Sequence, residues 1–310
     1  MGRGTLGFIL GAVGLLIAVP IGWWVAGRGE APVTPALPID SPLFDAGVAD
    51  LPAVLGGFAG EVELRHGQGE WRKAQKGELV LPSDRLRTKD GSWAVVVGGE
   101  AWEVRMESGT EVELSELSHS ISKILLETGL AKATVRGAAR HTFEVRAANS
   151  DAVASTQSGA FTVASNGQGT VALGTQDGEV QFSGKGRVVI VRAGQQSLIR
   201  PGQAPSTPAP VPSSLFLKVA LPARTQVNTR KLKVVGQSEP GALVEVAGRV
   251  VTVGADGKFE TQLPLDEGKN AIEVRARSVG QKDARSSHAI ELDTRVRKTT
   301  VDKDLWGPKP

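Results

Sequence analysis

Four of the six tryptophans are the side chains of this sequence best suited to binding chemistry. An indole ring can stack on a sugar face or anchor a protein interface. Trp71, Trp93 and Trp102 fall within 32 residues of one another, and Trp306 lies in a polar tail that ends in proline. We take them as candidate partner-binding or glycan-binding residues. Two alternatives stay open: the first three could fill a small β core, and Trp306 could cap the preceding domain.

The residue types that carry catalysis or bind metals form no recognisable site. The sequence has no cysteine, which excludes thiol nucleophiles, disulfides and cysteine-ligated zinc. The four histidines lie far apart, without metal-ligand spacing. Ser118 and His119 are adjacent, and neighbours on a strand point to opposite faces, so they make a poor nucleophile and base. We expect no catalytic, metal or cofactor site, and therefore a protein that is not an enzyme.

The excess of positive charge does not predict a nucleic-acid partner. The net charge is +3 and the isoelectric point about 9.2. Residues 58–203 carry 17 basic and 17 acidic side chains, and residues 215–310 carry 17 basic and 12 acidic ones, scattered along the chain. Nucleic-acid binders normally gather lysine and arginine into a stripe or patch. An ordinary solvated surface explains this pattern better.

An uncharged stretch at residues 4–27 predicts a membrane anchor. About 20 apolar residues cross a hydrocarbon core of about 30 Å, and Trp23 and Trp24 stand where indole favours the interface. Arg3 precedes the stretch, and mainly acidic residues follow it, so we expect the N-terminus in the cytoplasm and the bulk in the periplasm. A cleaved signal peptide ending near residues 25–27 is the alternative. Both predictions place the rest of the chain on the periplasmic side of the inner (cytoplasmic) membrane, and the anchor would be a single-pass segment.

Two proline-rich segments divide the exported part. Residues 29–57 contain five prolines and little periodicity, which is typical of a stalk. Residues 201–214 contain five more, so we predict a semi-rigid linker at residues 204–214.

The regions beside the linker predict an all-β fold. Apolar residues alternate with polar ones over short runs, and from residue 142 such runs begin every nine residues, which indicates a sandwich, barrel or solenoid. Residues 120–130 could form a helical turn or a strand entering a bend. Residues 215–296 contain about seven short runs between turns, a rhythm that suits an immunoglobulin-like β-sandwich.

An ordered series of motifs in residues 58–203 resembles the FecR-domain family. It begins with Leu79 and the run Asp84 to Thr88, continues through Gly129 within residues 126–135, and ends with three runs: Gly159 to Val163, Asp177 to Val180 and Ala193 to Gln195. Ser83 departs from the family glycine. The resemblance implies an extracytoplasmic, solenoid-like or sandwich-like stack of strands. Family regulators pass signals through an N-terminal cytoplasmic segment to a sigma factor. Here only about five residues would remain on the cytoplasmic side of the expected membrane segment.

The C-terminal region resembles the bacterial immunoglobulin-like domains that are appended to surface glycosidases and adhesins. The matching runs are residues 235–246, 256–259 and 265–274. This class is functionally broad, and a fold alone does not assign a role.

These observations predict six segments: an anchor (1–28), a stalk (29–57), a FecR-like domain (58–203), a linker (204–214), an immunoglobulin-like domain (215–296) and a polar tail (297–310). We expect a non-enzymatic, membrane-anchored periplasmic scaffold or sensor that binds an envelope protein or a cell-wall glycan such as peptidoglycan or another polysaccharide. The alternatives are a FecR-type transmembrane regulator of a sigma-factor pathway and a carbohydrate-binding accessory protein.

Overall fold

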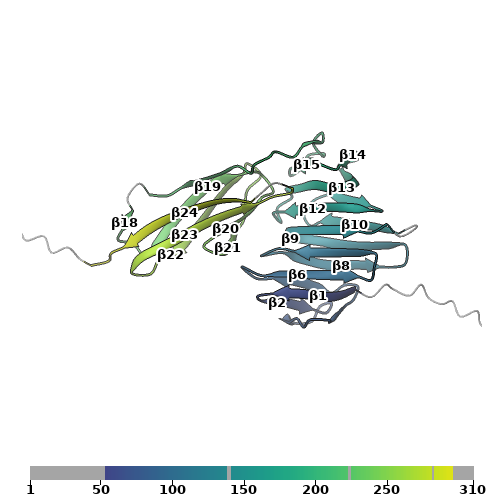
Figure 1. Ribbon diagram of the computed structural model, residues 1–310, viewed down its shortest axis with the longest axis horizontal. Helices are drawn as coiled ribbons and strands as arrows, with labels where there is room; N and C mark the ends of the chain where they lie inside the picture. The colour runs from purple at the N-terminus through teal and green to yellow at the C-terminus, as the bar shows by residue number, and fades with distance from the viewer. Residues whose placement is uncertain (1–52, 138–140, 223–224, 281–282, 296–310) are drawn as a thin grey trace, which may run out of the picture. The chain divides into compact units, whose positions relative to one another are not determined.

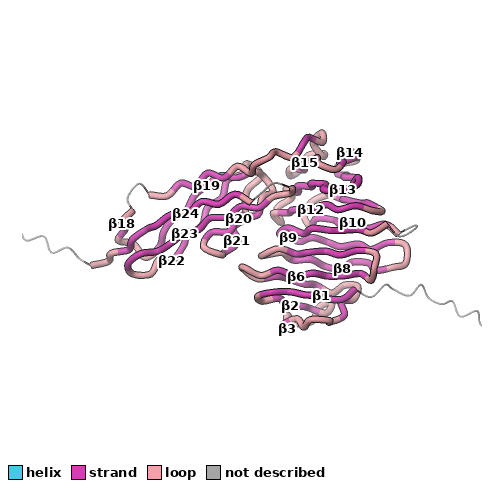
Figure 2. Tube along the Cα trace, in the orientation of Figure 1, coloured by secondary structure: helices cyan, strands magenta, loops and turns pink. Residues whose placement is uncertain are grey.

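The computed structural model describes residues 53–137, 141–222, 225–280 and 283–295. The chain divides into two compact units, Met1–Asp45 and Ala46–Pro310, and every described residue belongs to the second. The predicted anchor, most of the stalk and the polar tail lie outside the described residues. Figure 2 shows strands and loops throughout the described part, which confirms the all-β prediction. No helix in that part has the length and apolar character to cross a membrane.

Residues 53–211 form the N-terminal module, whose sixteen strands belong to one continuous sheet. The strands are β1 (Ala53–Ala59), β2 (Val62–Arg65), β3 (Arg72–Lys73), β4 (Leu79–Val80), β5 (Arg85–Thr88), β6 (Trp93–Gly98), β7 (Trp102–Met106), β8 (Glu111–Leu117), β9 (Ile121–Val135), β10 (Thr142–Ala147), β11 (Val153–Thr156), β12 (Gly159–Ser165), β13 (Val171–Gly184), β14 (Arg187–Arg192), β15 (Gln195–Ile199) and β16 (Ala209–Pro210). In Figure 1 these strands stack one above another.

Two long strands, β9 and β13, each run through both halves of this folded sheet. The first half of β9 pairs with β8 and, in parallel, with β10, while its second half pairs with β7 and β12. The change of partners falls at Gly129, whose φ is +100°. A Cβ there would lie 2.4 Å from the Thr110 hydroxyl oxygen, so only glycine fits. Residues 120–130 are therefore strand entering a bend, the second of the two alternatives. β13 likewise pairs with β12 and β15 first and with β14 last.

The core lies between these two halves of the sheet. Alternation with period two places one side of strands such as β6 and β7 inward, and the largest fully buried side chains include Trp102, Phe143, Phe161 and Phe182. The nine-residue rhythm is confirmed in part, because the runs predicted to begin near residues 169 and 178 are one continuous strand, β13.

Both predicted boundaries of this module need correction. The last residues of the predicted stalk belong to β1, which pairs with β6. The predicted linker does not run free, because β16 within it pairs with β15. The Ser206 N–H donates to the Leu198 carbonyl (3.0 Å) and the Val211 N–H to the Gly194 carbonyl (2.9 Å). Proline is tolerated on such an edge strand, so proline content alone did not exclude pairing.

Residues 215–295 form the C-terminal module, in which two sheets share one core. One sheet has the order β17-β19-β22 and the other β18-β24-β23-β20-β21. The strands are β17 (Leu217–Ala220), β18 (Gln226–Val227), β19 (Lys231–Ser238), β20 (Leu243–Val246), β21 (Arg249–Val251), β22 (Lys258–Pro264), β23 (Gly268–Arg277) and β24 (Ala284–Leu292). All seven predicted strands are present, and β18 is additional.

Candidate binding cleft

Trp102 occupies the centre of the N-terminal module. Its side chain is fully buried on β7, and its ring centroid lies 5.3 Å from that of Phe143. The indole Nε1–H donates to the Ser122 hydroxyl oxygen at 2.8 Å, which satisfies its one polar group. This burial removes Trp102 from the candidate binding residues, because no face of the ring is open to a ligand. Trp306 lies outside the described residues.

Trp71 precedes β3 and is partly exposed. The guanidinium groups of Arg65 and Arg87 lie over its ring, 4.8 and 4.1 Å from the centroid. Arg87 is also bound to Glu63, so an ion pair fixes one of these two cations. The indole thus has a structural role in a cation–π cluster on the outer face of the sheet.

Trp93 is partly exposed at the start of β6 and lines a cleft of about 450 Å³, which we call the junction cleft. The Arg105 guanidinium lies 4.2 Å from the Trp93 ring centroid, and its Nε donates to Glu107 at 3.0 Å. The cleft is lined from both modules by Gly91, Ser92, Trp93, Arg105, Glu107, Arg275, Arg277 and Asp283. Trp93 is therefore the predicted residue that the structure brings together with other functional groups.

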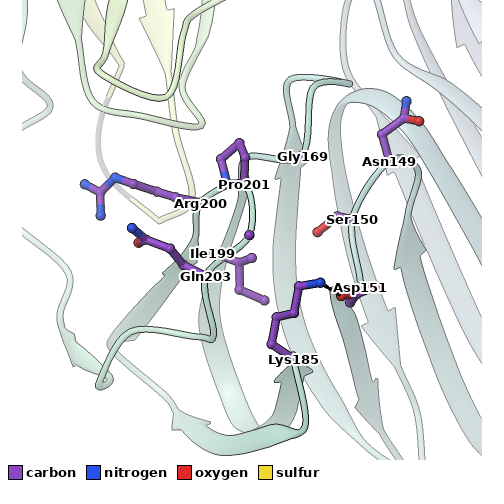
Figure 3. A pocket seen from close by; sticks show the side chains of 10 residues that line it. Asn149, Ser150, Asp151, Gly169, Lys185, Ile199, Arg200, Pro201 and Gln203 are labelled. Atoms are coloured by element: carbon purple, nitrogen blue, oxygen red, sulfur yellow. Dashed lines mark ion pairs between the residues drawn. The ribbon is translucent and has the colours of Figure 1, made fainter.

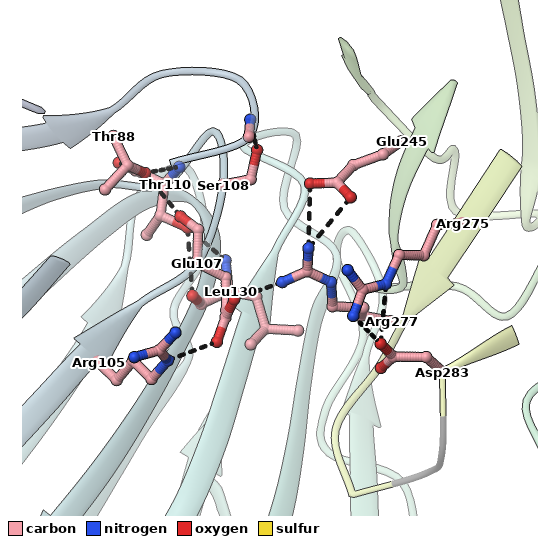
Figure 4. Close-up of polar contacts among 11 residues, drawn as sticks. Thr88, Arg105, Glu107, Ser108, Thr110, Leu130, Glu245, Arg275, Arg277 and Asp283 are labelled. Carbon is pink, nitrogen blue, oxygen red and sulfur yellow. Dashed lines mark hydrogen bonds and ion pairs between the residues drawn. The ribbon is translucent and has the colours of Figure 1, made fainter. Parts of the chain in front are cut away.

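An ion-pair network forms the wall of this cleft (Figure 4). Arg277 on β23 donates to the two Glu245 carboxylate oxygens at 3.2 and 3.1 Å and also to Glu107 of the N-terminal module. Arg275 Nε donates to Asp283 at 2.8 Å. Burial alone would lower the pKa of Arg275, but the hydrogen bond and charge of Asp283 outweigh it and hold that pKa above its ordinary value. Arg275 therefore stays charged at neutral pH.

The two modules approach closely enough at this junction to exclude side chains. A Cβ on Gly174 of β13 would lie 2.5 Å from the Val279 carbonyl oxygen. The backbones at residues 174 and 279 can therefore approach this closely only because residue 174 is glycine. The Val250 N–H donates to Asp90 at 3.0 Å, and the Asn166 side-chain amide donates to the Val253 carbonyl at the same distance. A small apolar cluster completes the contact: Leu130, Ala164, Ala172, Leu243 and Val279.

The chemistry of the junction cleft suits a neutral, hydroxyl-rich ligand. Three guanidinium groups supply donors, carboxylates supply acceptors, and an indole supplies an apolar surface. Because each of these guanidinium groups has a carboxylate partner, the cleft is not a strong anion site. The sequence could not reveal it, since Glu107 and Arg277 are 170 positions apart.

His66, His141 and His288 form hydrogen bonds within the fold, and the His141 ring lies 3.1 Å from the His119 carbonyl oxygen. Arg72 can only donate, so it donates to His66 Nε2 (2.7 Å) while His66 Nδ1 donates to Asp84 (2.8 Å). His288 Nε2 bonds to the Ser286 hydroxyl at 2.8 Å. This serine–histidine pair was missed by the sequence analysis, although Ser-x-His on a strand places both side chains on one face. Within the described ranges, no three His, Cys, Asp or Glu residues group as metal ligands.

A second, smaller notch lies at the hairpin between β13 and β14 (Figure 3). Its volume is about 370 Å³, and Lys185 pairs there with Asp151 at 2.9 Å. Ser150, Arg200 and Gln203 also line it. None of the predicted candidate residues lies in this notch.

Comparison with known proteins identifies the fold of one part of the chain. Residues 225–294 match the family model of glucodextranase, domain B. This is an immunoglobulin-like domain, so the C-terminal module has the predicted class, while the match covers less than half of the chain. The FecR family model does not match, and no curated protein does.

Two solved structures resemble the chain weakly. Both are crystal structures of a "putative anti-sigma factor" from Parabacteroides distasonis ATCC 8503, at 1.65 and 2.50 Å resolution. Sequence identity is 17% and 18%, the TM-score is 0.36 for each, and each match covers 40% of this chain. The chain spans 59% of the length of each of those proteins. At this score the likeness carries no argument about function.

Proposed function

We propose that the chain is a non-enzymatic envelope scaffold whose body holds a cell-wall glycan in the junction cleft. The observation that carries the proposal is the meeting of Trp93 and Arg105 from one module with Arg275 and Asp283 from the other. The location in the envelope rests on the uncharged residues 4–27 and the charges beside them.

Sugar chemistry fits this set of groups better than the chemistry of a charged ligand. Carbohydrate hydroxyls both donate and accept hydrogen bonds, and the apolar faces of sugar rings pack against indole. The paired guanidinium and carboxylate groups can bind hydroxyls without breaking their ion pairs. The match of the C-terminal module to a domain of glucodextranase supports a place beside polysaccharide.

The test uses the full chain in detergent micelles with soluble peptidoglycan fragments and dextran oligosaccharides as probes. Calorimetric titration should show binding of one of them, weakened about tenfold (about 1.4 kcal/mol) by Trp93→Ala and by Asp283→Asn. Lys233→Gln is the matched control, because Lys233 stands on β19 and pairs with Glu260 at 2.8 Å, and neither residue lines the cleft. Absence of glycan binding, or equal binding by all variants, overturns the proposal.

A second candidate, a FecR-type regulator of a sigma-factor pathway, is favoured by one observation. Gly129 and Gly178, two glycines of the motif series, have φ values of +100° and +72° and stand where β9 and β13 change partners. These two glycines, on which part of the FecR resemblance rests, therefore occupy positions that the fold requires. Deletion of the protein should then alter transcription from promoters of an extracytoplasmic sigma factor, and an unchanged transcript profile would reject this candidate.

A further inference from the structure

β14 is an edge strand with a preformed conformation. It pairs antiparallel with β13 along its whole length, and no other described strand pairs with it. Lys185 and Gly186 form the connecting turn with φ values of 50° and 72°, the two positive values of a type I′ hairpin. Such a tight hairpin holds the strand extended without a partner on its other side.

The hydrogen bonds at the end of β14 show which of its backbone groups face outward. The Ala193 N–H donates to the Gly178 carbonyl at 3.0 Å, whereas the Arg192 N–H donates to the Gln195 side chain at 3.1 Å. Because inward and outward backbone groups alternate along an antiparallel strand, the N–H and C=O groups of Val188 and Ile190 point away from β13. Two residues therefore offer a donor and an acceptor each to an added strand.

The side chains of the same residues lie on the outer face of the sheet. Val191 is fully buried and Val189 packs against the core, so the alternation sends Val188 and Ile190 outward. Val188 is 58% exposed and Ile190 partly exposed. Natural edge strands usually avoid apolar residues that could pair with other chains.

Arginine stands at both ends of this edge. No carboxylate of a described residue forms an ion pair with Arg187, and Arg192 lies 3.9 Å from Glu179 with both side chains about two-thirds exposed. A second copy of the chain, added in either direction, would bring these arginines near their counterparts. Like charges oppose that pairing, whereas acidic residues at the ends of the added strand would favour it.

We propose that β14 binds an extended segment of a partner protein by strand addition, and that this segment carries β-branched apolar residues between acidic ends. The backbone groups of Val188 and Ile190 supply the ladder, their side chains supply apolar contact, and Arg187 and Arg192 select the charge of the segment. This inference is independent of the glycan proposed for the junction cleft.

The probe is a fluorescent octapeptide of alternating valine and threonine with two glutamates at each end, titrated against the full chain in detergent by anisotropy. A peptide with lysines at its ends is the charge control. The native chain should bind the acidic peptide, and the double variant Arg187→Glu/Arg192→Glu should prefer the lysine peptide, each preference being roughly three- to tenfold. The variant Ile190→Pro should lose binding, because it removes an outward N–H and leaves the ladder with β13 intact.

Failure of the native chain to bind the acidic peptide, or a charge preference that the double variant does not reverse, overturns the proposal. If Ile190→Pro does not fold by circular dichroism, the charge reversal alone decides. Dimerisation of the full chain that the double variant changes would show that a second copy is the occupant, which also overturns it.

Discussion

Replacing Arg277 with glutamine should destabilise the body by about 3 kcal/mol. Arg277 bonds to Glu107 and Glu245, and the side chains of these three residues are only 17%, 19% and 10% exposed. Breaking a buried ion pair by removing one partner costs about 3–5 kcal/mol, because the other charge stays desolvated. Because these three side chains keep some exposure to solvent, we expect the loss of stability to lie at the lower end of that range. Since the network joins the modules, their cooperative unfolding should weaken as well.

The assay is thermal unfolding of the full chain, followed by circular dichroism and calorimetry. For a body of this size, about 3 kcal/mol corresponds to a fall in Tm of roughly 6–12 °C. Arg285→Gln, which removes a pair 59% and 57% exposed, should change Tm by no more than about 2 °C. Adding Glu245→Gln to Arg277→Gln should recover part of the loss, because it removes the stranded charge. A Tm fall in Arg277→Gln no larger than in the control would refute the assigned role of the network.

Three further results are expected. Gly174→Ala should separate the modules locally, with faster hydrogen exchange around residues 275–280, whereas Gly57→Ala, with open space around its Cβ position, should not change exchange there. Trp102→Phe should lower the free energy of unfolding by about 2–4 kcal/mol in chemical denaturation, through a lost hydrogen bond and a cavity, and a value below about 1 kcal/mol would argue against its central position. Burial alone would raise the pKa of Glu63, but bonds to Lys89 and Arg87 lower it below 4.5. Stability from this group is therefore present above about pH 4.5 and lost as the pH falls through the lower folded value, and Glu63→Gln should flatten that fall in a pH series of Tm measurements.

Much of the strand content followed from the alternation of apolar residues. The seven strands predicted in the C-terminal module are present, and the alternation is clearest in β19, which buries every second side chain. At residues 120–130 the pattern was ambiguous, since Gly129 interrupts the alternation where β9 changes its partner strands.

The candidate cleft could not be predicted, because its residues come from distant parts of the chain. Trp93 was identified by residue type alone, and the same criterion selected Trp102, which fills the core. Residue type does not reveal whether a side chain is buried, and burial is the property that distinguishes Trp102 from Trp93. The linker was misjudged for a related reason: its prolines predicted a free spacer, whereas pairing with β15 depends on a partner strand that local composition does not reveal.

Strands β9 and β13 each belong to both halves of the sheet, and this limits where the chain can gain or lose residues during evolution. A single inserted residue in an ordinary strand reverses the facing of the side chains beyond it. In β9, an insertion before Gly129 would leave the pairs with β12 in place but shift the pairs with β8 and β10 by one residue. The strand registers in the two halves of the sheet would then be incompatible. Insertions and deletions should therefore collect in the hairpin turns, while the lengths of these two strands stay constant among descendants of this sequence.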